Sequence, residues 1–179
     1  MMLVLFCHGQ AFAGQWKIIQ TKHLNISYKD VNDLKKFYKE IDFSNSSEGF
    51  FSFSSSSGNE SGFEEKLASK MDALFEKVQL ILDMRKPMKK VRLNLYPDKS
   101  SLNEAYFNIY KKKKELRAWY IYEYNTIFIN VQDVFAGMLA HEMAHAIVDH
   151  YLTVKPPRAT AEILARYVDT HLNEEPKTY

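Results

Sequence analysis

The chain has 179 residues, of which 46% are hydrophobic and 26% charged, with 12 phenylalanines and 11 tyrosines. This length suits one domain with its own core, and the composition is typical of a globular protein. A formal net charge of +2 is too small to indicate a nucleic-acid partner, and the sequence predicts no membrane span. The single cysteine, Cys7, excludes an internal disulfide.

Residues 1–13 have the pattern of a signal peptide. An apolar run is followed by Ala11-Phe12-Ala13, a small-x-small pattern typical of a signal-peptidase site. Cleavage after Ala13 would leave Gly14 at the start of the mature chain. We therefore expect a periplasmic or secreted protein with one domain over residues 14–179. The alternative for this segment is an N-terminal strand or a disordered tail.

Strands and helices interleave in the first part of that domain. Alternating apolar residues predict strands, and apolar residues spaced three and four apart predict helices. A stretch dominated by Ser, Gly and Asn favours a flexible loop. The expected elements are one or two strands in residues 16–28, a helix over 30–41, the loop over 44–62, a long helix over 63–84, a strand over 91–96 and a helix over 101–110.

The last third predicts a hairpin and two helices. Residues 116–131 favour two strands joined by a tight turn at Tyr124-Asn125. A helix is expected from Asn130, which forms a helix-start pair with Asp133, and a final helix follows Pro156-Pro157 and spans 158–172. This order of elements predicts an α+β domain with one mixed β-sheet backed by helices.

The first of these two helices contains the sequence His141-Glu142-Met143-Ala144-His145. Histidines four apart project from the same side of a helix, so both rings can bind one metal ion. Zinc accepts imidazole nitrogen and keeps a position open for water in catalytic sites. Glu142 is then placed to act as a general base on that water. The alternative is that both histidines lie on a surface helix and bind no metal.

A catalytic zinc needs a third protein ligand. Asp149 lies two turns beyond His141, about 12 Å along the helix, so we expect it to orient His145 or to lie in solvent. The three-histidine extension of the motif would need Gly and His where the chain has Val148 and Tyr151. Glu162, early in the helix after the proline turn, has a suitable position. Its alternative role is an ion pair with Arg166.

The segments HEMAHAIVDHYL and PPRATAEILARYVDTHL resemble the gluzincin metallopeptidases, in particular small bacterial exported proteins of the peptidase MA-like type. Their pattern is H-E-x-x-H, a short turn with proline, and a helix with E-G-x-A-x-Y. Glu162, Ala165 and Tyr167 match this pattern, whereas Ile163 replaces the usual glycine and Ala159 stands where tryptophan is common. The resemblance covers Thr126 to Leu172 and implies a zincin-like fold, with the motif helix followed by a glutamate-bearing helix.

The resemblance implies a zinc-dependent hydrolase that cuts peptide or protein substrates. His141, His145 and Glu162 would hold one Zn²⁺, and Glu142 would deprotonate its water. Tyrosine or histidine often stabilises the oxyanion in this family, which makes Tyr167, Tyr151, His150 and His171 candidates. Asp149 is the candidate orienting residue. One strand of the hairpin could pair with an extended substrate, so the cleft candidates are Trp119, Tyr120 and Tyr122. Ordinary packing is the alternative for all three.

The departures at Ile163 and Ala159, with the small size of the chain, motivate an alternative function. A degenerate peptidase could retain zinc without hydrolysing peptides and act as a binding or assembly module in the envelope. Zinc content and peptide cleavage distinguish the two functions. A metal-free structural domain is the third alternative, and it predicts that the chain binds no zinc.

Overall fold

The computed structural model describes residues 15–43 and 60–174. The expected signal peptide and most of the expected serine-rich loop lie outside the described residues. The strands are β1 (Lys17–Gln20), β2 (Leu24–Tyr28), β3 (Val91–Tyr96), β4 (Ala118–Ile121) and β5 (Thr126–Asn130). The helices are α1 (Val31–Glu40), α2 (Glu60–Ile81), α3 (Lys99–Tyr110), α4 (Ala136–Tyr151) and α5 (Arg158–His171).

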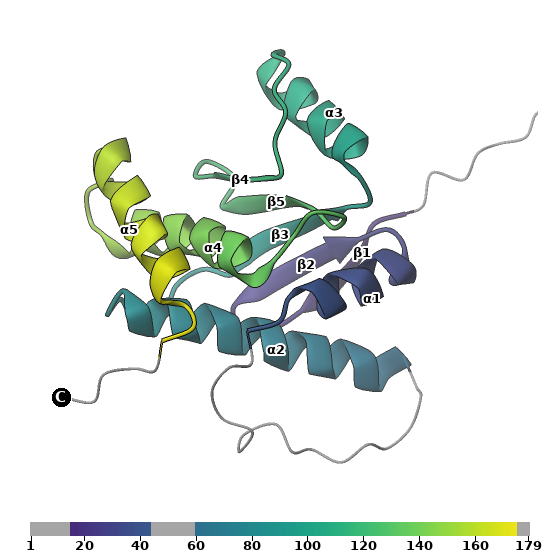
Figure 1. Cartoon of the computed structure of the whole chain (residues 1–179), viewed down its shortest axis with the longest axis horizontal. Helices are drawn as coiled ribbons and strands as arrows, with labels where there is room; N and C mark the ends of the chain where they lie inside the picture. The colour runs from purple at the N-terminus through teal and green to yellow at the C-terminus, as the bar shows by residue number, and fades with distance from the viewer. Residues whose placement is uncertain (1–14, 44–59, 175–179) are drawn as a thin grey trace, which may run out of the picture.

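The five strands form one mixed sheet in the order β1-β2-β3-β5-β4 (Figure 1). The central strands β2, β3 and β5 are parallel, whereas β1 and β4 pair antiparallel at the two edges. The expected α+β class and mixed sheet are therefore confirmed. The expected hairpin is also present, because β4 and β5 pair through Trp119 opposite Phe128 and the turn contains Asn125 in the left-handed region.

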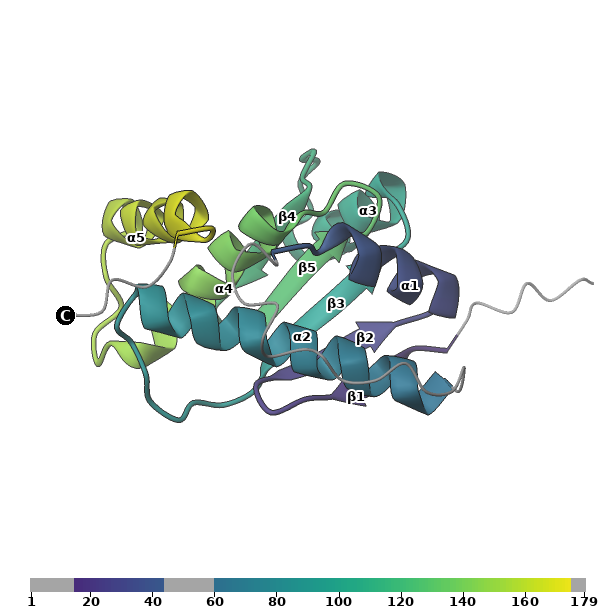
Figure 2. The ribbon, with the colours of Figure 1, turned by 60° about the horizontal axis from the view of Figure 1, so that its bottom comes forward.

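Helices cover both faces of the sheet. Alternate residues of β3, namely Val91, Leu93 and Leu95, point into the main core with the apolar faces of α1, α2 and α4. Helix α3 covers the opposite face, where Leu102 packs with residues of β4 and β5 in a smaller cluster. Figure 2 shows α1, α2 and α4 in front of the sheet and α3 behind it. In the described residues, no helix is long and apolar enough to cross a membrane.

Several helix boundaries differ from expectation. The predicted start at Asn130 is wrong, because parallel pairing with β3 extends β5 to Asn130, opposite Tyr96, and α4 begins only at Ala136. Residues 60–62 of the expected loop belong to α2, because adding residues to a formed helix costs little. The same helix ends at Ile81, shortly before Asp83 adopts a left-handed conformation.

The main core predicts a large effect of truncating Phe75 on α2. Its side chain is fully buried and its ring stacks on His23, with centroids 4.8 Å apart. Phe75→Ala is expected to lower the free energy of unfolding by about 3–5 kcal/mol, measured by urea denaturation. Phe107→Ala, at a side chain that is 42% exposed, is the control and should cost less than about 1 kcal/mol. Equal losses would contradict the described core.

Candidate metal centre

Helix α4 presents His141, Glu142 and His145 from a largely buried position. Its sequence has good helix formers and includes the alanines 136, 140, 144 and 146, all of which are buried. Such small side chains allow neighbouring elements to approach closely. Helix α4 packs against α2, β4 and α5, so its orientation is fixed on several sides.

Helix α5 brings the third acidic side chain back to α4. The chain turns at Pro156-Pro157, and α5 begins directly afterwards at Arg158, where proline at a helix start is well tolerated. Its buried stripe is Ala161, Ala165 and Val168, which belongs to α5's packing face. Glu162 lies beside this stripe and therefore faces the histidines of α4.

The three side chains meet as the motif predicted. The Nε2 atoms of His141 and His145 are 3.2 Å apart. Oε2 of Glu162 lies 3.3 Å from Nε2 of His141 and 3.5 Å from Nε2 of His145. The three donor atoms thus form a nearly equilateral triangle. In the described part of the chain, Glu162 pairs with these rings and not with Arg166.

The donor set can hold a metal ion. One ligand atom from each residue lies within 4.8 Å of the other two, and the described residues contain no second group of this kind. Oε2 of Glu162 is buried without a hydrogen-bond partner. A buried carboxylate oxygen that accepts no hydrogen bond is costly, and a cation held between it and the two imidazoles would remove that cost.

Glu142 is not one of these donors, and the backbone N–H of Tyr120 on β4 donates a hydrogen bond to its carboxylate. Burial raises the pKa of Glu142 to about 7, and the negative charge of Glu162 adds to the rise. The hydrogen bond from Tyr120 opposes both effects. The carboxyl therefore exchanges its proton near neutral pH, which suits general acid–base chemistry.

His145 is held in the form that binds metals. Burial lowers its pKa, and the neighbouring His141 lowers it further, although the carboxylate of Glu162 acts in the opposite direction. A neutral imidazole keeps a lone pair free for a metal.

No family model matches the chain, and neither a curated protein nor a solved structure matches it.

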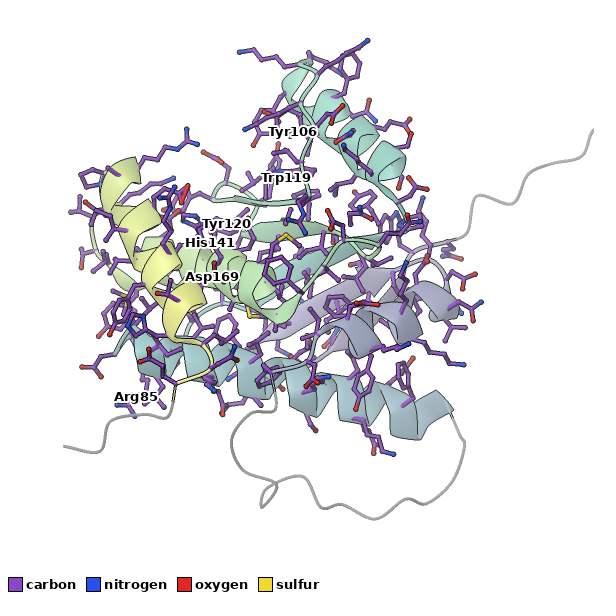
Figure 3. All side chains as sticks on the ribbon, in the orientation of Figure 1. Arg85, Tyr106, Trp119, Tyr120, His141 and Asp169 are labelled. Atoms are coloured by element: carbon purple, nitrogen blue, oxygen red, sulfur yellow. The ribbon has the colours of Figure 1, made fainter. Side chains whose placement is uncertain are left out.

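Of the candidates beyond these four residues, Tyr120 is the one that bonds to Glu142. Figure 3 shows Tyr120 on β4 and His141 on α4, two neighbouring elements. Trp119, the adjacent residue, points to the other face of the sheet, where it stacks on Phe128 at 4.4 Å and contacts Tyr106. The structure therefore places Trp119 in the α3 cluster, and ordinary packing describes it better than a cleft.

The remaining candidates lie around the ends of α4 and α5. Asp149 is buried and its Oδ2 is 3.6 Å from Nζ of Lys155. The backbone carbonyl of Tyr151 accepts a hydrogen bond from Lys86, whose Nζ also lies 4.6 Å from the centre of the Tyr151 ring. Tyr167 is 47% exposed and stacks on His171. None of these contacts is with the donor triangle, although the charge of Asp149 acts on His145 and raises its pKa.

The hydrogen bond between Tyr120 and Glu142 has no signal in the sequence. It joins residues of a strand and a helix through a backbone group, so no side-chain pattern could have indicated it. His150, an oxyanion candidate in the sequence, contacts both Tyr120 and Tyr122 on the β4 side of α4.

Proposed function

We propose that this protein is a zinc-dependent peptidase of the gluzincin type. The observation that carries the proposal is the donor triangle of His141, His145 and Glu162 with the buried carboxyl of Glu142 beside it. The helix order and the antiparallel strand at the sheet edge support a zincin-like arrangement. The pattern in residues 1–13 supports an extracytoplasmic location for this activity.

The size of the triangle supports zinc as the metal. Zinc binds imidazole nitrogen and carboxylate oxygen at about 2.0–2.2 Å in tetrahedral geometry. Two ligands of such a tetrahedron are about 3.3 Å apart, and the three observed separations are 3.2, 3.3 and 3.5 Å. Two histidines with one glutamate also form a typical set of three protein ligands for catalytic zinc.

Each residue has a defined role in the proposed hydrolysis. Bound zinc supplies Lewis acidity, which makes water a better nucleophile and polarises the carbonyl of the peptide bond. Glu142 accepts a proton from the attacking water and passes it to the leaving nitrogen. The hydrogen bond from the N–H of Tyr120 restricts the orientation of the Glu142 carboxyl.

The outer edge of β4 is suited to an extended peptide. The N–H of Asn130 donates to the carbonyl of Arg117, so Arg117 faces β5 and the alternate residues Ala118 and Tyr120 direct their backbone groups outward. The N–H of Tyr120 already donates a hydrogen bond to the carboxylate of Glu142. The carbonyls of Ala118 and Tyr120 and the N–H of Ala118 would then pair with substrate.

The test combines zinc analysis with cleavage of a peptide library by the full chain. We expect about one zinc per chain and cleavage that stops when a chelator removes the metal and returns when zinc is restored. One bound zinc without cleavage would favour a binding or assembly module over a peptidase. A protein without zinc would contradict both functions.

A further inference from the structure

Tyr120 and His150 form a polar pair between the edge strand β4 and helix α4. The hydroxyl of Tyr120 lies 2.8 Å from Nε2 of His150 and 3.5 Å from Oδ1 of Asn125. The backbone N–H of the same tyrosine donates to the carboxyl of Glu142. Tyr120 therefore connects the carboxyl in the middle of α4 to a histidine near the end of that helix.

Three further side chains enclose this pair. The ring of Tyr122 stacks on His150, with centroids 5.0 Å apart and planes inclined by 13°. Nζ of Lys155 lies 4.3 Å above the ring of Tyr122 and 3.6 Å from Oδ2 of Asp149. The contacts of His150 thus restrict the position of its ring as well as its hydrogen bond.

Both partners are neutral, which suits a directional hydrogen bond. Burial raises the pKa of Tyr120, and the charge of Asp149 raises it further. Burial also lowers the pKa of His150. The Tyr120 hydroxyl can therefore donate to the free lone pair of His150, and the distance is normal for such a bond.

We propose that Tyr120 and His150 are positioning residues, whose hydrogen bond fixes the edge strand on α4 so that the Tyr120 N–H holds Glu142 in place. An edge strand has a neighbouring strand on one side only, and β4 has four residues. Its distance from α4 must therefore be set by side chains. The side chain of Tyr120 bonds to His150 on α4, and the backbone N–H of the same residue donates to Glu142.

The inference rests on the proposed function, because it describes the orientation of the same general base. Its test has one arm that needs no activity. Hydrogen exchange of the Tyr120 amide, followed by NMR, reports whether the N–H still bonds to Glu142. The Trp119 amide is the internal reference, because Trp119 faces β5 in the strand pairing.

Tyr120→Phe removes the hydroxyl and keeps the ring, and His150→Phe keeps a ring to stack on Tyr122. Each variant is expected to speed exchange of the residue 120 amide about tenfold and leave the Trp119 amide unchanged. The double variant should match the singles, because both remove the same bond. Tyr124→Phe, in the exposed turn after β4, is the control and should exchange as the wild type does.

The second arm measures hydrolysis. Tyr120→Phe and His150→Phe should lower kcat about tenfold, with KM and zinc content unchanged. Unchanged exchange at residue 120 would overturn the inference, as would equal acceleration at residues 119 and 120, which indicates general loosening. Faster exchange with an unchanged kcat would overturn the positioning role. If the wild type cleaves no peptide, the proposed function fails, and the exchange arm alone decides whether the bond holds Glu142.

Discussion

Glu142→Gln is expected to lower kcat for peptide hydrolysis by roughly 10²–10⁴-fold while the protein still binds one zinc. Glutamine has nearly the same shape as glutamate, but its amide cannot accept the proton of the attacking water. Glu142 lies outside the triangle of metal donors, so its replacement leaves that triangle intact. The amide oxygen can still accept the hydrogen bond from Tyr120.

The measurement pairs steady-state kinetics with zinc analysis of the same samples. Glu65→Gln, the same chemical change at an exposed position on α2, is the matched control and should retain full activity. A Glu142→Gln variant that hydrolyses peptides at the wild-type rate would refute the role of general base. A variant that loses its zinc would show that Glu142 is needed for the metal itself.

Removal of the third donor should have its main effect on metal affinity. Glu162→Ala is expected to weaken zinc binding by about 100-fold, because structural zinc sites gain 10–16 kcal/mol from four ligands and one ligand contributes roughly 3 kcal/mol. Hydrolysis should fall with zinc occupancy. Saturating zinc should also raise the melting temperature of this variant less than that of the wild type.

Competition with a zinc-binding dye measures this affinity directly. Asp169→Ala is the matched control, because Asp169 is an acidic residue on the same helix, two turns beyond Glu162, and lies next to Gly137 at the start of α4. It should bind zinc as the wild type does. Equal weakening in both variants would indicate that α5 has moved, whereas unchanged affinity in Glu162→Ala would exclude Glu162 as a ligand.

The donor triangle was predictable from the sequence because its parts are local. His141 and His145 are related by one helical turn, and Glu162 follows a proline turn that reverses the chain direction. Short connections make consecutive helices pack side by side. The structure accordingly places all three donor atoms together. That these atoms bind a metal, and that the metal is zinc, are predictions.

Features that depend on distant pairing were less predictable. Trp119 and Tyr120 alternate between the two faces of β4, but both are aromatic, so the sequence does not tell which one faces α4. The end of β5 was also missed, because the Asn130 to Asp133 pattern resembles a helix start. Pairing with Tyr96, which is 34 residues earlier in the chain, keeps Asn130 in the sheet.

The three donors lie on the last two helices of the chain, so the order of synthesis decides when the metal site is complete. A chain is synthesised from its N-terminus, so its C-terminal helix is made last. The strands and α2 that support α4 come early, the histidines follow, and Glu162 emerges last. A chain without α5 offers only two donors and would hold zinc weakly. The proposed metal site would therefore be complete only after α5 has folded onto α4.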